Sequence, residues 1–248
     1  MKDLMLIAGP CTIETLEKTL SIAKKLKSLG IEYLRGGAFK PRTEPESFQG
    51  LGEKGLKILK EVKEKTGMKI VTEVMGPEEI ELVMQYADIL QIGSRNMHNY
   101  DLLKKIGKKA SNKDVLLKRG MSATKKELLG SIRYLKQYGH IGRLYICERG
   151  IRTFSNGEYD RFTLDVSLIA DLKDSYDIIV DPSHAAGKSS LVEYLAYSGI
   201  AAGAKGFMIE VKANEEDIPK CDANQAITIE KFAEILRKCK ELHKKLYK

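Results

Sequence analysis

The stretch of residues 33–50 combines side chains that bind anionic groups. Arg35 lies near its start, and the sequence Lys40-Pro41-Arg42-Thr43 follows after two glycines. An Arg guanidinium offers two parallel donors to paired oxygens, a Lys ammonium is a point charge, and a Thr hydroxyl is a neutral donor. This combination indicates a site for an anionic, phosphorylated ligand. The alternative for a Lys-x-Arg sequence is a solvated basic loop.

Further cations follow other short apolar runs of the chain. These are Arg95, Lys118 and Arg149. Together with Arg35 and Arg42 they exceed the needs of one phosphate group, and they would repel one another in an empty apolar pocket. The sequence therefore indicates a bisphosphate or two separate anionic ligands.

One thiol, one imidazole and two carboxylates could bind a metal ion. They belong to Cys11, His184, Glu210 and Asp222. A thiolate combined with nitrogen and oxygen donors suits one divalent ion of the group Mn²⁺, Fe²⁺, Co²⁺ and Zn²⁺, rather than Mg²⁺. Taken singly, such a Cys is more often a buried thiol and such a His a loop residue. Their positions after predicted strands favour the ligand interpretation.

Short apolar runs alternate along the chain with longer amphipathic runs, and these elements must position the candidate residues. The predicted strands cover residues 4–8, 31–34, 69–74, 89–92, 115–118, 144–147, 178–180 and 206–209. The predicted helices cover residues 14–29, 55–65, 77–86, 100–109, 122 or 124 to 138, 164–174, 190–197 and 229–248.

Eight strand–helix units in 248 residues predict an α/β fold, the (β/α)8 TIM barrel. We expect one catalytic domain over residues 1–248, with no regulatory domain. The alternative, a doubly wound open sheet, more often has fewer units and a glycine-rich first turn. In a barrel the loops after the strands line one face, and the candidate residues occupy those loops.

Composition excludes several other classes. The net charge of +8 could indicate nucleic-acid binding, but most Lys residues alternate with Glu at helical spacing, and the chain has no Trp. The four Cys residues are scattered, which argues against a disulfide framework. No apolar run approaches the roughly 20 residues that span a bilayer, and the opening residues lack a signal peptide. We expect a cytoplasmic protein that binds neither nucleic acid nor membranes.

Seven long motifs, spread over essentially the whole chain, resemble 3-deoxy-D-arabino-heptulosonate 7-phosphate (DAHP) synthase in its short type I form. They are Ile7-Ala-Gly-Pro-Cys11, Gly36-Gly-Ala-Phe-Lys-Pro-Arg-Thr43, Gln91-Ile-Gly-Ser-Arg-Asn-Met97, Leu116-Leu-Lys-Arg-Gly120, Cys147-Glu-Arg-Gly-Ile-Arg-Thr-Phe154, Val180-Asp-Pro-Ser-His-Ala-Ala-Gly187 and Met208-Ile-Glu-Val211.

The resemblance implies a metal-dependent condensation of phosphoenolpyruvate with erythrose 4-phosphate, the first step of the shikimate pathway. By matching motif, the metal ligands are Cys11, His184, Glu210 and Asp222. The residues around phosphoenolpyruvate are Arg35, Glu73, Ser94, Arg95, Lys118 and Arg149. Those around erythrose 4-phosphate are Lys40, Pro41, Arg42 and Thr43, and the catalytic roles fall to Lys40, Cys11 and His184. Lys40 or a water on the metal protonates the new alkoxide.

The sequence departs from the family pattern at a few positions. Cys221 stands where relatives have Ser, which places a second thiol beside the expected metal, as a bystander. Phe162 replaces a common Asn, Lys212 a common His and His98 a common Gln. The family tends to form tetramers, so we expect a homo-oligomer, either a tetramer or a dimer. The predicted barrel takes up the residues from Leu4 to Tyr247, which leaves no room for a regulatory domain. We therefore expect no inhibition by aromatic amino acids.

Two alternatives remain. The sister enzyme 3-deoxy-D-manno-octulosonate 8-phosphate synthase uses arabinose 5-phosphate, but its loop reads Lys-Ala-Asn-Arg-Ser where this chain has Lys40-Pro-Arg-Thr43. The segment Gly93-Ser-Arg-Asn-Met97 also favours the heptulosonate enzyme. A non-catalytic, basic nucleic-acid-binding protein is the more remote alternative, and it gives no reason for Cys11 or His184.

Overall fold

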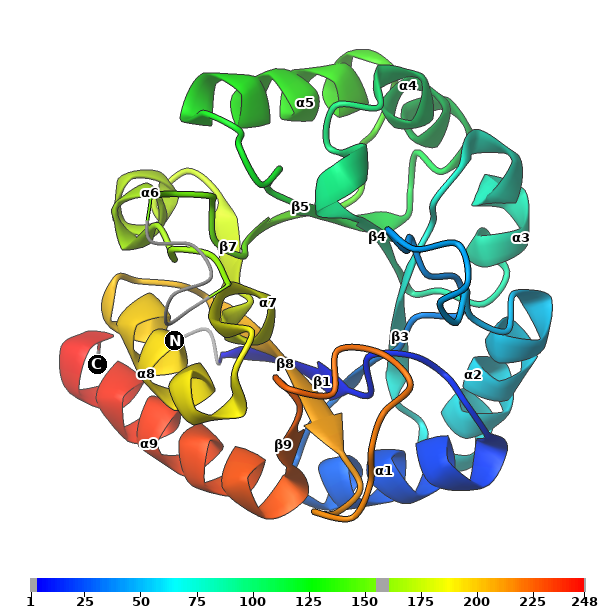
Figure 1. Cartoon of the computed structure of the whole chain (residues 1–248). Helices are drawn as coiled ribbons and strands as arrows, with labels where there is room; N and C mark the ends of the chain where they lie inside the picture. Colours follow the sequence, from blue (N-terminus) through cyan, green and yellow to red (C-terminus); the bar gives the residue numbers. More distant parts are fainter. Residues whose placement is uncertain (1–3, 155–160, 248) are drawn as a thin grey trace.

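The computed structural model describes residues 4–154 and 161–247, and its centre is a closed barrel of eight parallel strands (Figure 1). The strands are β1 (Met5–Gly9), β2 (Tyr33–Arg35), β3 (Lys69–Glu73), β4 (Ile89–Ile92), β5 (Asp114–Lys118), β6 (Leu144–Glu148), β7 (Asp177–Val180) and β8 (Gly206–Lys212). Each strand pairs with the next, and β1 pairs with β8 in parallel, which closes the sheet.

A ring of helices surrounds the barrel (Figure 1). They are α1 (Leu16–Ser28), α2 (Glu53–Thr66), α3 (Ile80–Met84), α4 (Tyr100–Lys109), α5 (Lys125–Gln137), α6 (Val166–Leu172), α8 (Ser189–Ala201) and α9 (Ile229–Tyr247). Among the described residues there are also α7 (Pro182–Ala186), two 3₁₀ turns, η1 (Pro77–Glu79) and η2 (Ser94–Asn96), and the short strand β9 (Ile227–Thr228) beside β8.

Local chemistry explains where several helices begin. The Thr124 hydroxyl accepts a hydrogen bond from the backbone N–H of Glu127, whose carboxylate accepts one from the Thr124 N–H; this capping box starts α5. Asp181 caps α7 in the same way, by accepting a hydrogen bond from the His184 N–H. The cap at Asp181 is important for the site, because it connects a buried carboxylate to His184, the third residue of α7.

The apolar residues form two layers. The larger layer lies between the strands and the outer helices, and the smaller one fills the inside of the barrel. The inner layer consists of Ile7, Val71, Ile89, Leu116, Tyr145, Cys147, Ile179 and Met208. These side chains fill the inside of the barrel. The polar residues at the carboxyl ends of the strands therefore lie next to a packed apolar layer.

The predicted TIM barrel is confirmed, and the open-sheet alternative is wrong because β1 pairs with β8. The bounds of β4 and α4 agree with the prediction. The helix predicted over residues 77–86 is a 3₁₀ turn followed by the five-residue α3. The short α7 and β9 were not predicted from the sequence, and residue 248, the expected end of the last helix, lies outside the described residues.

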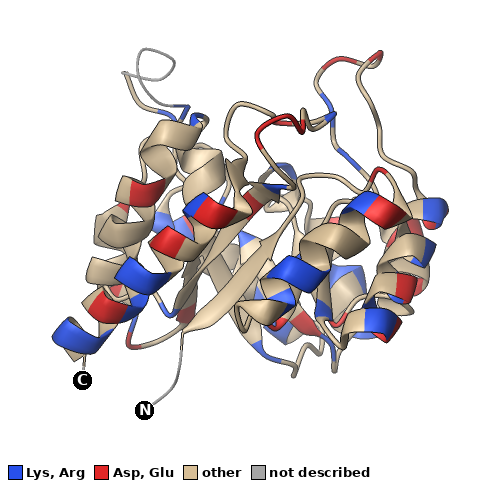
Figure 2. Cartoon of the chain, turned by 90° about the horizontal axis from the view of Figure 1, so that it is seen from below, with Lys and Arg blue, Asp and Glu red and all other residues tan. Residues whose placement is uncertain are grey.

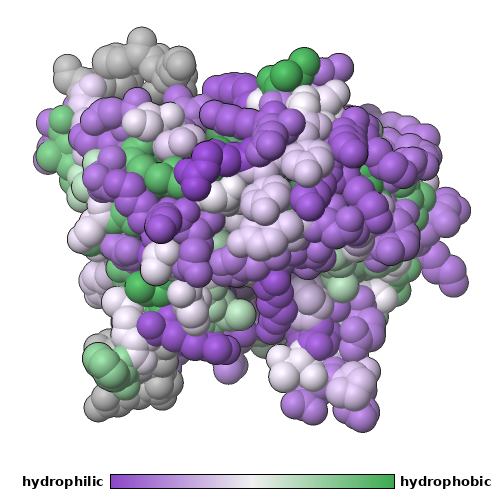
Figure 3. All heavy atoms as spheres, turned by 90° about the horizontal axis from the view of Figure 1, so that it is seen from above, coloured by the Kyte–Doolittle hydropathy of each residue, from purple (hydrophilic) through white to green (hydrophobic). Residues whose placement is uncertain are grey.

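Positive and negative residues alternate on the outer helices, as the sequence indicated (Figure 2). Several are i,i+4 ion pairs, such as Lys65 with Glu61 and Lys238 with Glu234. The face in Figure 3 is mostly hydrophilic, with small groups of hydrophobic residues scattered over it. In the described part of the chain, no helix combines the length and the apolar character needed to cross a membrane.

Candidate active site

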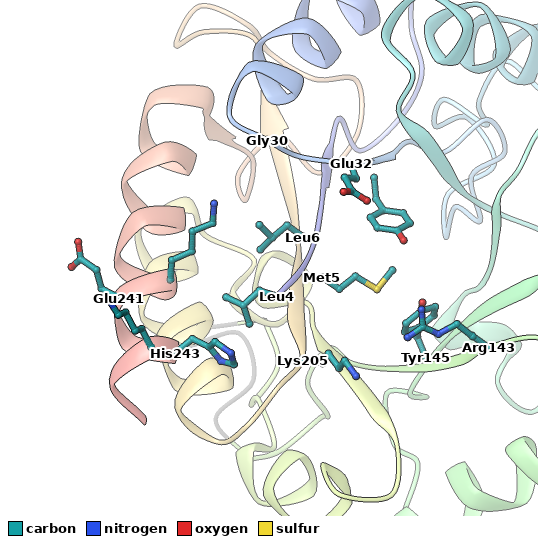
Figure 4. A pocket seen from close by; sticks show the side chains of 13 residues that line it. Leu4, Met5, Leu6, Gly30, Glu32, Arg143, Tyr145, Lys205, Glu241 and His243 are labelled. Atoms are coloured by element: carbon teal, nitrogen blue, oxygen red, sulfur yellow. The ribbon is translucent and has the colours of Figure 1, made fainter. Parts of the chain in front are cut away.

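Two hollows lie at opposite ends of the barrel. The larger is lined by residues at the amino ends of the strands, among them Met5, Tyr145 and Lys205 (Figure 4). Its cations Arg143 and Lys205 both pair with the carboxylate of Asp177. The other hollow lies at the carboxyl ends of the strands, where TIM-barrel enzymes carry their catalytic residues.

The hollow at the carboxyl ends, here called the site pocket, contains most of the residues predicted from the sequence. Those that line it are Arg35, Lys40, Pro41, Arg42, Thr43, Glu73, Ser94, Arg95, Lys118, Arg149, His184 and Asp222. Cys11 and Glu210 are buried directly behind this lining, in contact with Lys40 and Arg35 respectively. The fourteen predicted residues therefore converge, although they come from loops throughout the chain.

The four predicted metal ligands belong to two overlapping groups of donor atoms that share Asp222. Donor atoms of His184, Glu210 and Asp222 lie within 4.8 Å of one another, and so do those of Cys11, Cys221 and Asp222. Cys11 Sγ is 3.4 Å from Asp222 Oδ2, and His184 Nε2 is 3.4 Å from Glu210 Oε1. A mixed sulfur, nitrogen and oxygen set at this spacing fits one divalent ion of the transition series.

Asp181 connects this donor set to the cations of the pocket. Its Oδ2 lies 2.5 Å from Lys118 Nζ and 2.7 Å from His184 Nδ1. Burial alone would raise the pKa of Asp181, but its interactions with His184 and Lys118 hold that pKa well below its usual range. Burial in turn lowers the pKa of His184, which favours the neutral imidazole that a metal requires.

Arg35 and Glu210 form a buried ion pair. The Arg35 Nη1 atom lies 2.6 Å from Glu210 Oε1, and both side chains are almost inaccessible to solvent. Burial opposes the charged form of Arg35, but Glu210, Cys11 and Asp181 together more than offset it, and the pKa of Arg35 is raised. The other oxygen, Glu210 Oε2, accepts a hydrogen bond of 2.7 Å from Gln225 Nε2. Glu210 is thereby fixed in orientation toward the donor set.

Lys40 is a buried cation beside the thiols. Its Nζ lies 3.2 Å from Cys11 Sγ and 3.2 Å from the Cys11 carbonyl oxygen. Burial opposes its charge, but the interactions of Lys40 with Cys11 and Cys221 act in the opposite direction, and the pKa of Lys40 is raised. Lys40 therefore stays protonated, and it is available as a proton donor inside the pocket.

The thiols of Cys11 and Cys221 are coupled. Cys11 Sγ donates to Cys221 Sγ at 3.2 Å, and this hydrogen bond together with burial raises the pKa of Cys11. The same hydrogen bond, helped by Lys40, lowers the pKa of Cys221. Arg42 Nη1 lies 2.5 Å from Cys221 Sγ, so the cation of the outer loop contacts the thiol directly.

Arg149 is a second buried cation of the pocket. Its guanidinium stacks on the Phe162 ring at 4.0 Å from the centroid, and within the described residues no carboxylate pairs with it. Burial lowers the pKa of Arg149, although Asp181 acts in the opposite direction. A buried guanidinium without a paired carboxylate is a binding site for an anion from solution. Phe162, a departure from the family pattern, thus makes a cation–π contact with Arg149.

Several residues of the site were not singled out from the sequence. They are Asp181, Gln91, Arg161 and Gln225. Gln91 donates to Glu73 Oε2 at 3.0 Å, and Arg161 lies 3.3 Å from Asp222 Oδ1. Asp181 and Gln91 lie within the quoted motifs, so their position at strand ends was the available signal. Arg161 and Gln225 follow no predicted strand, and only the fold brings them to the pocket.

Comparisons with known proteins agree with this geometry. The sequence profile described as the DAHP synthetase I family matches residues 2–248. A phospho-2-dehydro-3-deoxyheptonate aldolase of Thermotoga maritima is 46% identical over 96% of this chain and 69% of its own length. A 2-dehydro-3-deoxyphosphooctonate aldolase of Campylobacter jejuni subsp. doylei is 30% identical over 86% of this chain and 88% of its own length.

Solved structures give the same result for the fold. The crystal structure of the Thermotoga maritima phospho-2-dehydro-3-deoxyheptonate aldolase (DAHP synthase) has a TM-score of 0.92 at 44% identity, over 99% of this chain and 71% of that one. A truncated form of 3-deoxy-D-arabino-heptulosonate 7-phosphate synthase from the same organism has a TM-score of 0.89 at 42% identity, over 99% of this chain and 88% of that one. The profile match over nearly the full length, together with these relatives, makes the chain a member of the DAHP synthetase I family.

Proposed function

We propose that this chain is a DAHP synthase, a transferase that condenses phosphoenolpyruvate with erythrose 4-phosphate and water to give DAHP and inorganic phosphate. The observation that carries the proposal is one pocket that combines two groups of cations with a mixed sulfur, nitrogen and oxygen donor set. The family and its relatives support the same reaction. The product would enter aromatic amino acid biosynthesis.

The inner cations suit phosphoenolpyruvate. Arg35, Lys118 and Arg149 are buried at strand ends. Arg95, from η2 above them, also lines the pocket, with Ser94 beside it. A carboxylate and a phosphate on one small molecule need several fixed donors, and buried cations hold such groups more firmly than surface cations do. Glu73 lines the same side of the pocket.

The outer loop suits erythrose 4-phosphate. Arg42 and Thr43 are at the rim, and Arg95 Nη2 lies 3.5 Å from the Thr43 hydroxyl, so the two anion sites are adjacent. Pro41 stiffens the turn between Lys40 and Arg42. We assign Arg42 and Thr43 to the phosphate of this substrate, which leaves its aldehyde end near Lys40 and the donor set.

Cys11, His184, Glu210 and Asp222 would hold one divalent ion, of the group Mn²⁺, Fe²⁺, Co²⁺ and Zn²⁺. When bound, such an ion supplies a Lewis acid that polarises an aldehyde oxygen. The protein positions its own ligands for this purpose: Asp181 orients His184, and Arg35 with Gln225 orients Glu210.

The side chains then define the course of the reaction. The cations hold the two anionic substrates face to face, which orients C3 of phosphoenolpyruvate toward the aldehyde carbon. The C–C bond forms, water adds to C2, and the resulting hemiketal phosphate loses inorganic phosphate. Lys40, buried and protonated, is placed to donate a proton to the oxygen that develops from the aldehyde.

Two further features stay predictions. We propose a homotetramer or dimer and a cytoplasmic location. The chain covers 69% of the length of the Thermotoga maritima relative.

An assay of substrate pairs tests the proposed function. The purified protein is given phosphoenolpyruvate with erythrose 4-phosphate or with arabinose 5-phosphate, and the release of phosphate is followed. We expect turnover with erythrose 4-phosphate, loss of activity with a chelator, and recovery when one of the four metals is added. Turnover with arabinose 5-phosphate but not with erythrose 4-phosphate would instead identify the octulosonate enzyme. The octulosonate aldolases of Campylobacter jejuni subsp. doylei and Helicobacter hepaticus are 30% and 28% identical to this chain.

A further inference from the structure

Cys221 lies in the loop of residues 213–226, between β8 and β9, and this loop is fixed against α1. The Lys220 N–H donates to Glu14 Oε1 at 2.9 Å, and Asp217 Oδ1 lies 2.5 Å from Lys18 Nζ. The loop extends over the end of β1, where Cys221 meets Cys11 (Figure 1). Cys221 therefore occupies a defined position at the pocket wall and is buried there.

The next residue, Asp222, has an unusual backbone conformation, and its side chain lies close to that of Cys221. Asp222 has a φ of 51°, and in the described part of the chain it is the one residue other than glycine with a positive φ. This left-handed conformation is unfavourable for most residues, although Asp tolerates it, and it occurs preferentially at functional sites. At this turn Cys221 Sγ lies 3.4 Å from Asp222 Oδ2.

Three donor atoms consequently form a compact triangle. Cys11 Sγ is 3.2 Å from Cys221 Sγ, and each sulfur is 3.4 Å from Asp222 Oδ2. Ligand bonds of about 2.3 Å to sulfur and about 2.1 Å to oxygen, at the angles of about 90–120° between five ligands, give separations of roughly 3.1–4.0 Å between neighbouring donors. A shift of a few tenths of an ångström would let all three atoms contact one ion.

The surrounding charges also suit a second thiolate. Two thiolates and the carboxylates of Glu210 and Asp222 would leave an excess of negative charge around a divalent ion. Lys40 Nζ at 3.2 Å from Cys11 Sγ and Arg42 Nη1 at 2.5 Å from Cys221 Sγ offset that excess. A serine at position 221 would give these cations a weaker partner.

We propose that Cys221 is a second thiolate ligand of the metal centre, and that it makes the centre selective for Zn²⁺, Co²⁺ or Fe²⁺ over Mn²⁺. Thiolates favour the softer ions of the series, so each added sulfur shifts the preference in that direction. The inference rests on the metal centre of the proposed function, but not on the identity of the two substrates. It also replaces the bystander role expected for Cys221 from the sequence.

The first test counts the sulfur ligands by absorption. Metal-free protein, kept reduced, is loaded with Co²⁺, and the sulfur-to-cobalt charge-transfer band is recorded. We expect Cys221→Ser and Cys11→Ser each to lose about half of the band intensity, because each removes one of two thiolates. Cys239→Ala, which changes a buried thiol of α9 outside the donor set, is the matched control and should keep the full band. A full band in Cys221→Ser, with none in Cys11→Ser, would overturn the proposal.

The second test uses the unaltered protein, so it does not depend on the folding of a variant. X-ray absorption of the Zn²⁺-loaded protein should show two sulfur ligands at about 2.3 Å. One sulfur would overturn the role of Cys221 and leave the proposed reaction standing. Absence of any bound metal would overturn the metal centre itself. In competition experiments, Cys221→Ser should lower the affinity for Zn²⁺ relative to Mn²⁺ by roughly 10-fold or more.

Discussion

The Lys118 ammonium and the Asp181 carboxylate form a buried ion pair, with 2.5 Å between Nζ and Oδ2. The pair connects a cation from the end of β5 to the residue that caps α7. Because the same Oδ2 also contacts His184 Nδ1, one carboxylate orients both a proposed substrate-binding cation and a proposed metal ligand. Asp181 therefore connects the proposed phosphoenolpyruvate site to the proposed metal site.

Asp181→Asn should lower the affinity for the metal by roughly 10- to 100-fold, because the carboxylate that orients His184 is replaced by a neutral amide. The KM for phosphoenolpyruvate should rise as well, since the carboxylate that fixes the position of the Lys118 ammonium is lost. Isothermal titration with Zn²⁺ and steady-state kinetics measure the two effects. Asp177→Asn, which changes a carboxylate at the opposite end of the barrel, is the control and should leave both values near those of the unaltered protein.

Arg42→Ala and Arg149→Ala should separate the two anion sites. Loss of one charge-assisted contact corresponds to about 1.5–3 kcal/mol, or roughly 10- to 100-fold in kcat/KM. We expect Arg42→Ala to raise the KM for erythrose 4-phosphate and Arg149→Ala to raise the KM for phosphoenolpyruvate. The measurement is initial-rate kinetics with each substrate varied in turn. Equal effects of one variant on both KM values would argue against this division of the pocket.

Metal binding should raise the melting temperature of the protein. Saturation at 100 times the dissociation constant adds about 2.7 kcal/mol to the free energy of unfolding, which corresponds to roughly 5–10 °C in a chain of this size. Differential scanning fluorimetry of metal-free protein with and without Zn²⁺ checks this value. The shift should vanish in His184→Ala, and a shift of equal size in that variant would place the bound ion elsewhere.

Gly206→Ala should destabilise the barrel by several kcal/mol. A Cβ at this position would lie 1.7 Å from the Met5 carbonyl oxygen, where β1 and β8 close the sheet, so the backbone would have to move. Gly130→Ala in α5 is the matched control. Its Cβ meets only the far end of Arg133, at 3.8 Å, so the better helix propensity of Ala should stabilise by up to about 1 kcal/mol. Urea denaturation followed by circular dichroism compares the two variants.

The fold was predictable because its signals are local and repeated. A strand such as Ile89–Ile92 and a helix such as Tyr100–Lys109 each have a clear apolar period and clear ends. The short α7 has no such period, and its start depends on the cap at Asp181. The two-residue β9 forms only because β8 continues to Lys212 and offers it a partner. Tertiary context, rather than local sequence, determines both.

The site was predictable to the extent that its residues follow strands. Arg35 and Lys118 end strands and Glu210 lies near the end of β8, and the barrel brings these ends to one face. The contact of Arg42 with Cys221 has no such signal, because it joins loops that are far apart in the sequence. Gln225 reaches Glu210 only through the path of the loop that follows β8. The roles of the fourteen predicted residues stay predictions until the substrates and the metal are tested.

The closure of the barrel by β1 and β8 has a consequence for folding. Cys11 follows the first strand, whereas Glu210 and Asp222 come from the last strand and the loop after it. An ion held by these residues would join segments separated by about 200 residues, and long loops gain most from such a cross-link. During synthesis the complete donor set cannot exist until the final strand has emerged from the ribosome and paired with the first. Capture of the metal would therefore mark the last step of assembly, and it would discriminate against truncated chains.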